Sequence, residues 1–447
     1  MAVKRLCGTA VGLAGALLLA GLTACDIQDP ASDEPSKPFL TVPELYYLRP
    51  YGDRTGTPDK TPYAVRAGDK GKPGIRRLTA DVAPDGRDTV RLKKSGACEG
   101  DSAHLVCEVG RDYSNWADTA RAEPSVVKGA RAGDTAVIRY TYTTHDGRKL
   151  TARTRFVVGE PVVEAVTPAY RKGLLRPGSE LTAPFLVRNT GEVPVKGLGF
   201  AMIADGTDFE ERYGNCRYPE LQKGHLAVCE LPDVTIEPGE TVAVRPDLRL
   251  RVPKTVIYPS YGRDVWALDM GPGEHDSYSE GGDLGDGPDL TAQPADAEGQ
   301  FVPGGGVTNL VVDTHADYRV SAVELRGAPG THRTFRIEVH NDGPAATPTT
   351  TELIFDPPLG LKVLKQPMEE YDDDLYRPYC ENNGYTYTCQ VLGLEPGQTR
   401  TFEFTAELGD PGRGTLSLLD SPHRAPWTEG RRDPNPKNDE ATIRVVP

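Results

Sequence analysis

The chain lacks the composition of a membrane-embedded protein and the periodicity of a helical one. Its 447 residues are 38% hydrophobic and only 7% aromatic, which is enough for packed cores but too little for an integral membrane protein. The sequence ends at Pro447 without a hydrophobic span or a Leu-Pro-x-Thr-Gly signal, so we expect no anchor at that end. Amphipathic helical periodicity is nearly absent, which argues against a two-lobed α/β solute-binding protein.

The sequence also lacks the motifs that would indicate catalysis. No G-x-S-x-G, H-E-x-x-H, P-loop or dinucleotide-type glycine motif occurs in the context that it needs. Residues 125–128 match the S-x-x-K of penicillin-binding enzymes, but the companion K-T-G and a surrounding helical pattern are missing. The eight histidines have no ligand-like spacing. We therefore predict no enzyme activity, no cofactor and no metal site.

Three weaker features each have a simpler interpretation than a ligand site. Asp283, Asp286 and Asp289 lie in a Gly-rich stretch, and a second acidic run spans 369–374 (Glu369, Glu370, Asp372, Asp373, Asp374). Calcium prefers several carboxylates on a flexible loop, but neither run has EF-hand spacing, so solvated acidic loops are favoured. The three tryptophans could form a ligand platform, although packing in cores or loops is the simpler interpretation. They are Trp116, Trp266 and Trp427.

The charge of the chain excludes one class of partner. Its formal net charge is −14. Loss of the first 24 residues removes Lys4 and Arg5 and no acid, which leaves −16. A chain this acidic is repelled by phosphate backbones, so we expect no nucleic-acid partner.

The N-terminus has the three parts of an exported leader. Two basic residues precede an apolar, Gly-rich stretch at 7–21 that is short for a membrane-spanning helix. Leu22-Thr23-Ala24-Cys25 then resembles the bacterial lipobox, in which small residues precede an acylated cysteine. The resemblance implies a signal peptide at 1–24 and lipid (palmitate-type) chains on Cys25, which hold the protein at the extracytoplasmic face of the membrane. The alternative is an ordinary secretory signal.

The remaining cysteines predict three local disulfides. Of eight cysteines, Cys7 leaves with the leader and Cys25 carries the lipid. The other six fall into three close pairs that are more than a hundred residues apart, and an exported chain enters an oxidising compartment. We therefore expect each pair to close on itself. The predicted bridges are Cys98–Cys107, Cys216–Cys229 and Cys380–Cys389.

An internal repeat surrounds the second and third cysteine pairs. Apolar residues alternate on the way to an Asn-x-Gly turn in both units, at a constant offset of 152 from Gly178/Gly330 to Gly191/Gly343. After the cysteines, Glu-Pro-Gly-Glu-Thr at 237–241 corresponds to Glu-Pro-Gly-Gln-Thr at 395–399. Period-two apolar runs between such turns are typical of antiparallel β-sandwiches. The fold class that we predict is all-β, with tandem immunoglobulin-like sandwiches that each contain one local disulfide.

The first unit is a weaker relative with one clear hairpin. Apolar residues fall on even positions both before and after His145-Asp146-Gly147. An odd-length loop is needed to keep both sets on one face of the sheet, so we predict a three-residue loop with Gly147 in the left-handed region.

These signals give a linear domain layout. A disordered tether at 25–40 follows the signal peptide at 1–24, and a divergent sandwich follows at 41–160. Immunoglobulin-like repeats are expected at 161–300 and 308–447. The Gly- and acid-rich stretch at 274–297 is expected as a long loop, and Gly-rich 301–307 as a linker.

The second and third units resemble the immunoglobulin-like conserved-repeat and cell-adhesion-related (CARDB-like) domains of bacterial surface proteins. The residues that carry this are His340-Asn341-Asp342-Gly343, the Cys380/Cys389 pair with the Glu-Pro-Gly turn after it, and the D-P-x-P-x-N-D ending at 433–439. The resemblance implies a fold and a surface location but no specific activity.

The function expected from the sequence is therefore non-catalytic. A membrane-anchored lipoprotein would present its modules to an unknown protein or cell-wall partner, or would serve as a spacer in the cell envelope. The alternatives are a solute-binding lipoprotein of a transporter and an envelope enzyme with an unrecognised site.

Overall fold

The computed structural model confirms the predicted fold class: an all-β chain of immunoglobulin-like sandwiches, each with one local disulfide. It describes residues 37–52, 62–68, 76–94, 98–109, 122–166, 173–219, 225–270, 281–296, 299–347, 350–372, 375–421 and 428–447. Within those ranges the helical elements are two 3-10 turns, η1 (Pro84–Gly86) and η2 (Leu268–Met270). Neither is long and apolar enough to cross a bilayer. The lipobox with Cys25, and the tether up to residue 36, lie outside the described residues.

The first sandwich contains ten strands. A six-stranded sheet has the order β2-β10-β9-β4-β7-β6, with two-stranded ribbons β1-β3 and β5-β8. The strands are β1 (Phe39–Thr41), β2 (Leu45–Leu48), β3 (Arg66–Gly68), β4 (Arg76–Val82), β5 (Val90–Lys94), β6 (Cys98–Gly100), β7 (His104–Val109), β8 (Ala122–Val126), β9 (Thr135–Thr143) and β10 (Lys149–Val158). Alternating residues of the central strands, such as Ile138, Tyr140 and Tyr142, fill its core.

The hairpin loop of this sandwich matches the prediction. Leu150 faces Tyr142 and Ala152 faces Tyr140 in the β9–β10 register, so the even positions share one face. The Thr144 N–H donates to the Arg148 carbonyl at 2.9 Å, which leaves a three-residue loop. Gly147 has φ +83°. The alternation of apolar residues was therefore sufficient to set the loop length.

The second sandwich contains twelve strands in two sheets. One sheet has the order β14-β17-β12-β11-β21, with β20 also on β17, and the other β19-β15-β16-β13-β18-β22. The strands are β11 (Val163–Val166), β12 (Glu180–Asn189), β13 (Val195–Asp205), β14 (Asp208–Phe209), β15 (Cys216–Tyr218), β16 (His225–Ile236), β17 (Thr241–Arg251), β18 (Ser260–Ala267), β19 (Asp283–Leu284), β20 (Thr291–Pro294), β21 (Phe301–Pro303) and β22 (Gly306–Asn309).

Two predicted connections are instead parts of this sandwich. The stretch expected as a long loop at 274–297 contributes β19, which pairs with β15, and β20, which pairs with β17. The stretch expected as a linker at 301–307 contributes β21 to one sheet and the start of β22 to the other. The glycines between them carry the chain from sheet to sheet in a tight turn. Gly305 has φ +104°, which residues with a side chain rarely adopt, and a Cβ there would lie only 3.0 Å from the Arg263 carbonyl oxygen.

The third sandwich contains twelve strands, two of which form a separate ribbon. Its sheets have the orders β23-β25-β32-β27 and β24-β34-β33-β26-β31-β30, and β28 pairs with β29 alone. The strands are β23 (Tyr318–Val320), β24 (Val323–Arg326), β25 (His332–Asn341), β26 (Thr351–Asp356), β27 (Lys362–Lys365), β28 (Met368–Asp372), β29 (Leu375–Pro378), β30 (Cys380–Asn382), β31 (Tyr387–Val391), β32 (Thr399–Glu407), β33 (Gly412–Asp420) and β34 (Glu440–Val446).

The repeat seen in the sequence is a structural repeat. β12 and β25 begin and end at positions that differ by 152. Each ends on a fully buried asparagine, Asn189 or Asn341. The Asn341 amide donates to the carbonyls of Ala345 at 2.9 Å and Leu394 at 2.7 Å, and its oxygen accepts from the Gly343 N–H. Asn189 makes the corresponding three bonds, so the Asn-x-Gly motif is an internal tie in both sandwiches.

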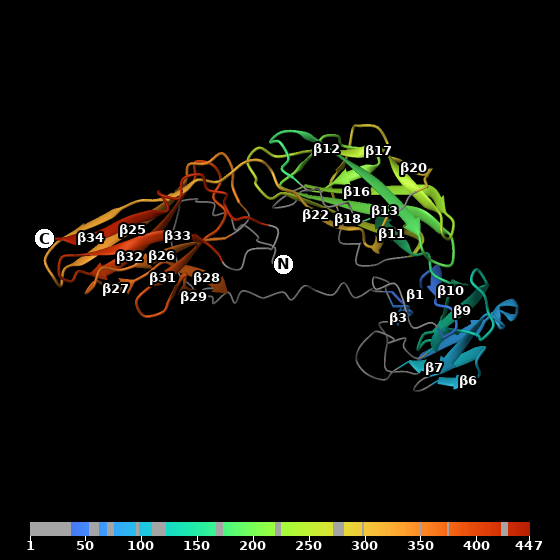
Figure 1. The fold of residues 1–447 in the computed structure, drawn as a ribbon. Coiled ribbons are helices and arrows are strands. Elements are labelled where there is room, and N and C mark those ends of the chain that lie inside the picture. The colour runs from blue at the N-terminus through green and yellow to red at the C-terminus, as the bar shows by residue number, and fades with distance from the viewer. Residues whose placement is uncertain are drawn as a thin grey trace, which may run out of the picture.

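Both junctions between sandwiches are packed by buried side chains. Figure 1 shows the backbone of the three sandwiches. Tyr47 of the first sandwich donates its hydroxyl to Asp269 of the second and packs with Val157 and Val193. Ile257 and Tyr258, which lie between β17 and β18, are buried in the core of the third sandwich. The Ile257 N–H donates to the Ala346 carbonyl, and the Tyr258 hydroxyl accepts from the Glu429 N–H at 2.6 Å. The chain is therefore a row of sandwiches joined by apolar contacts and backbone hydrogen bonds.

Candidate binding surface

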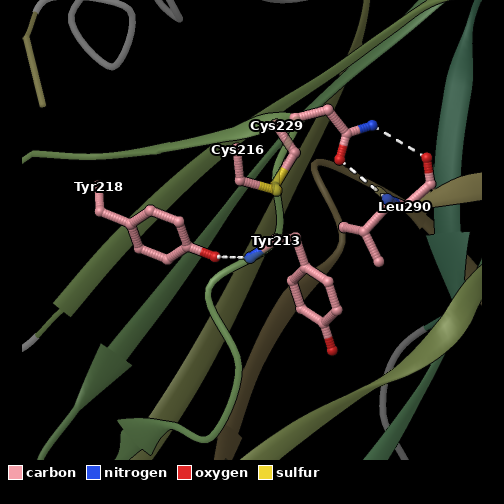
Figure 2. Close-up of a disulfide and its surroundings, with 6 residues drawn as sticks. Tyr213, Cys216, Tyr218, Cys229 and Leu290 are labelled. Carbon is pink, nitrogen blue, oxygen red and sulfur yellow. Dashed lines mark hydrogen bonds between the residues drawn. A yellow bond between two sulfur atoms is a disulfide. The ribbon is translucent and has the colours of Figure 1, made fainter. Parts of the chain in front are cut away.

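The three disulfides have the predicted pairing and a common geometry. In each, the two cysteines are directly opposite one another on neighbouring strands. Figure 2 shows the Cys216–Cys229 bridge beside Tyr213, whose backbone N–H donates to the Tyr218 hydroxyl at 2.6 Å. These cysteines are buried and bonded, so they have a structural role and offer no nucleophile.

Several of the described histidines contact a carboxylate at the surface. His104 contacts Asp81 at 2.5 Å, His225 contacts Asp208 at 2.9 Å, and His340 contacts Asp342 at 3.0 Å. Each contact joins one ring to one carboxylate. Among the described residues, no group of three or more His, Cys, Asp or Glu side chains is placed to hold a metal ion.

The S-x-x-K match lies in a strand. Ser125 is in β8, and its hydroxyl donates to the Arg91 carbonyl at 3.3 Å. The enzymes that use this motif need a helix to bring the lysine one turn beyond the serine, and β8 does not supply one. An open hollow of about 600 Å³ occurs in the first sandwich, where Arg153 and Arg155 line it with Glu44, and its lining contains no Ser, Cys or His.

One tryptophan can be placed. Trp266 is half-buried in β18 and packs against the buried side chains of Ala201, Leu226 and Val228. It packs on the sheet, as the simpler interpretation expects. Trp116 and Trp427 lie outside the described residues.

The two acidic runs differ from the expected loops. Asp283 is in β19, while Asp286 and Asp289 follow it on the surface. Glu369 and Glu370 are in β28, so the first half of the second run is a strand. Arg377, which faces Glu369 across the ribbon, donates to its carboxylate at 2.5 Å. Asp373 and Asp374 lie outside the described residues.

The β28–β29 ribbon of the third sandwich gathers several exposed large apolar side chains on two short strands. Four large side chains on it are about half exposed: Met368 at 54%, Tyr371 at 56%, Leu375 at 49% and Tyr376 at 59%. Monomeric proteins bury most such side chains, and aromatic residues are enriched at protein interfaces. The sequence did not reveal this surface because its apolar residues are interrupted by runs of two and three acids, which suggested a solvated loop.

The ribbon is fixed at its base and open along its sides. The Tyr379 N–H donates to the Pro367 carbonyl at 2.8 Å, and the Cys380–Cys389 bridge follows directly. The Tyr379 ring packs beside Phe402 of the core strand β32. Among the described strands none joins the outer edge of β28 or β29. Figure 1 shows the ribbon at the margin of the third sandwich.

The charges on the ribbon are uneven. The Arg377 guanidinium lies 5.7 Å from the centre of the Tyr371 ring and is also paired with Glu369. Glu370 is exposed and faces Tyr376 across the strands. The ribbon therefore offers aromatic rings, two open strand edges and an excess of negative charge.

Comparison with known proteins gives no family assignment. No protein-family model matches the sequence, and no curated protein matches it. Solved structures align only loosely. A protein of unknown function from Porphyromonas gingivalis W83 is 8% identical over 64% of this chain and 99% of that one, with a TM-score of 0.18.

Two further structures align at similar levels. The C-terminal domain of the Streptococcus agalactiae AgI/II polypeptide BspA is 9% identical over 64% of this chain and 100% of that one, with a TM-score of 0.17. A tetra-tandem repeat from the extending region of a large adhesion protein is 8% identical over 91% of this chain and 73% of that one, with a TM-score of 0.21. Nothing about the function of this chain follows from alignments at these scores.

Proposed function

We propose that this chain is a lipid-anchored, extracytoplasmic lipoprotein that has no catalytic role and binds a protein partner through the β28–β29 ribbon. The exposed tyrosines of that ribbon are the observation that carries the binding role. The lipobox at Cys25 and the three disulfides support the location, because disulfides persist in oxidising compartments. We assign the second and third sandwiches to the conserved-repeat type that their motifs resemble.

The chemistry of the ribbon favours a protein partner with basic groups. Tyrosines supply large contact area at little entropic cost, and they are enriched among the residues that dominate interface energies. The open edges of β28 and β29 can each pair with an extended segment. Glu370 beside Tyr376 favours lysine or arginine on that segment.

A spacer role is the second candidate, and the packed junctions support it. Burial of Ile257 in the core of the third sandwich, and of Tyr47 against Val193, limits hinge motion between neighbours. A stiff row of sandwiches would hold the third one at a distance from the lipid. Binding and spacing are compatible, because the ribbon lies on the sandwich farthest along the chain from Cys25.

The two alternative functions receive less support. A two-lobed solute-binding protein needs α-helices around its sheets, and the described residues contain only two 3-10 turns. An enzyme needs a base near a nucleophile or a metal centre, and the described lining of the hollow in the first sandwich contains no Ser, Cys or His.

Site-specific crosslinking tests the binding role. A photo-crosslinking residue placed at Tyr376 in intact cells should give a discrete adduct with one protein. The matched control is Tyr51, an exposed tyrosine of the first sandwich, which should give none. Glu370→Lys in the Tyr376 crosslinker background should reduce the adduct. If both positions give the same adducts, or Tyr376 gives none, the ribbon is not the binding surface and the spacer role remains.

Substitution of the lipobox cysteine tests the anchor independently. Cys25→Ser should release the protein from the membrane fraction or leave the precursor uncleaved, because a serine hydroxyl cannot take the lipid. The control is Cys7→Ser, which lies in the leader and should leave anchoring unchanged. Membrane association of the Cys25→Ser protein that still requires detergent would contradict the lipoprotein assignment.

A further inference from the structure

The formal charge of the chain is divided unevenly among its sandwiches. Residues 37–160, which contain the first sandwich, include 22 Lys and Arg against 16 Asp and Glu, a formal charge of +6. Residues 161–447 include 27 against 45, which gives −18. The second sandwich lies between the first and the third, so the basic sandwich is separated in space from the farther acidic one (Figure 1). The chain therefore has a basic end, and it is the end next to Cys25.

Positive charge of the first sandwich is concentrated on one face of its sheet. The neighbouring strands β9 and β10 contain four basic residues and no Asp or Glu. Even positions of both strands, such as Ile138 and Phe156, fill the core, so the odd positions lie on the opposite face. The four basic residues are all at odd positions and exposed, and we call them the β9–β10 face: Arg139, Lys149, Arg153 and Arg155.

The described carboxylates leave this face uncompensated. Arg139 and Arg153 are directly opposite one another, an arrangement in which like charges repel. Asp81 faces Arg139 from β4 but is paired with the His104 ring at 2.5 Å. In the part of the chain that the structure describes, no carboxylate forms an ion pair with Arg139, Arg153 or Arg155. The face therefore offers charged donors that an anionic surface can bind.

The short connection to Cys25 favours a membrane as that surface. The chain from Cys25 to Phe39 spans at most about 50 Å even when it is fully extended. This inference rests on the proposed lipid anchor, which would hold the first sandwich within that distance of the headgroups. At about 0.1 M salt the Debye length is about 10 Å, so acidic groups farther away than this do not cancel the charge of the face. Each basic side chain that comes close to an anionic bilayer strengthens binding to it.

We propose that the β9–β10 face lies on the anionic headgroups of the membrane in which Cys25 is anchored. A lipid chain combined with a basic patch anchors a protein more firmly than the lipid chain alone. The same surface potential repels the acidic second and third sandwiches, so the row of sandwiches is directed away from the bilayer. The β28–β29 ribbon of the third sandwich is thereby held outward, where a partner can reach it.

Vesicle sedimentation of the mature chain without its lipid tests the face independently of the anchor. The protein is residues 25–447 with Cys25→Ser, and the vesicles are phosphatidylcholine with or without about 30% phosphatidylglycerol, in about 0.05 M salt. The chain should bind the neutral vesicles at least ~10-fold more weakly than the anionic ones, and about 0.5 M salt should release it. Equal binding to both vesicle types, or binding to neither, would overturn the proposal. Fractionation of cells with Cys25→Ser reports the anchor separately.

Two matched pairs of substitutions localise the contact. Arg139→Gln with Arg153→Gln should weaken binding to the anionic vesicles about tenfold, whereas Arg139→Lys with Arg153→Lys keeps the charge and should retain binding. The control is Arg413→Gln with Arg444→Gln, which removes two exposed arginines that are directly opposite one another in the third sandwich, and it should bind as before.

Two results would assign the basic face a different role. Equal weakening by the two Gln pairs would show that binding follows the net charge of the chain, and it would overturn the proposal. A dimer that forms without vesicles, and that Arg139→Gln with Arg153→Gln dissociates, would assign the face to the acidic sandwiches of a second copy and would also overturn it.

Discussion

The buried asparagine at the end of β25 is the position where one substitution should unfold one sandwich. Asn341 is 0% exposed and makes three hydrogen bonds to backbone groups. Its backbone carbonyl also accepts from the Gly397 N–H at 2.8 Å, so the Asn-x-Gly and Glu-Pro-Gly motifs meet at this residue. In Asn341→Ala the backbone bond remains, but two carbonyls and one N–H lose their side-chain partner.

The loss in free energy of unfolding on Asn341→Ala follows from counting these groups. Leaving a buried polar group unsatisfied costs about 1–3 kcal/mol, so three of them should cost ~3–5 kcal/mol after partial relaxation. Hydrogen exchange measured by peptide then reports each sandwich separately. Protection of the third sandwich should fall at least ~100-fold, because about 1.4 kcal/mol corresponds to a factor of ten.

Two matched variants test whether the three hydrogen bonds of Asn341 are responsible for this loss. Asn189→Ala removes the corresponding three bonds and should lower protection in the second sandwich. Asn435→Ala removes an exposed asparagine from the third sandwich and should change little. If Asn341→Ala costs no more than Asn435→Ala, the three bonds do not hold the sandwich together. If Asn189→Ala weakens all three sandwiches equally, the units do not unfold separately.

Four further predictions follow from the described contacts. Burial raises the pKa of Asp439 to about 6, above its ordinary 3.8; the nearby carboxylates of Asp433 and Asp420 add to this rise, and the contact with Arg431 opposes it. The folded state therefore holds the proton more tightly than the unfolded state, so the free energy of unfolding of the third sandwich should fall as pH rises from about 4 to 6, and Asp439→Asn should flatten that slope in pH-dependent melts. Ile257→Ala should lower the free energy of unfolding by about 2–5 kcal/mol and expose the Ala346 N–H, which donates to the Thr255 carbonyl at 2.6 Å, to exchange. An effect confined to the second sandwich would contradict a packed junction. Non-reducing peptide mapping should recover the three local bridges without a cross-pair species. Calcium and magnesium should raise the melting temperature modestly and equally, since Glu369 is already paired with Arg377; a large calcium-selective rise would reveal a site in the acidic run.

Short-range sequence patterns were sufficient to predict the loop of the β9–β10 hairpin and the pairing of the six cysteines. Alternation around His145-Asp146-Gly147 predicted the loop length, because side chains change faces at every residue of a strand. Cysteine spacing predicted the bridges, because residues nine to thirteen apart can face one another across a single turn. In each case the partner lies nearby in the sequence.

The predictions that were wrong concern glycine and acidic residues. Gly304, Gly305 and Gly306 suggested a flexible linker, but their positive φ values form a tight crossing between two sheets. Composition does not distinguish these roles, since glycine serves both. The acids of β28 suggested a loop, but Glu369 is held in a strand by Arg377, eight residues later.

Contacts between distant strands explain why the buried charges were not predicted. Arg263 is the single arginine of β18, and Phe185 and Pro184, which lie almost eighty residues earlier, contact its guanidinium in the folded sandwich. Arg431 shows the opposite outcome, since it is as buried as Arg263 but donates to Asp420 and Asp439. Two arginines of equal burial thus differ in whether the fold supplies counter-charges. For Arg431 the counter-charges come from β33 and from the residue that directly precedes β34, whereas for Arg263 the fold supplies the rings of Phe185 and Tyr261 and the Pro184 carbonyl.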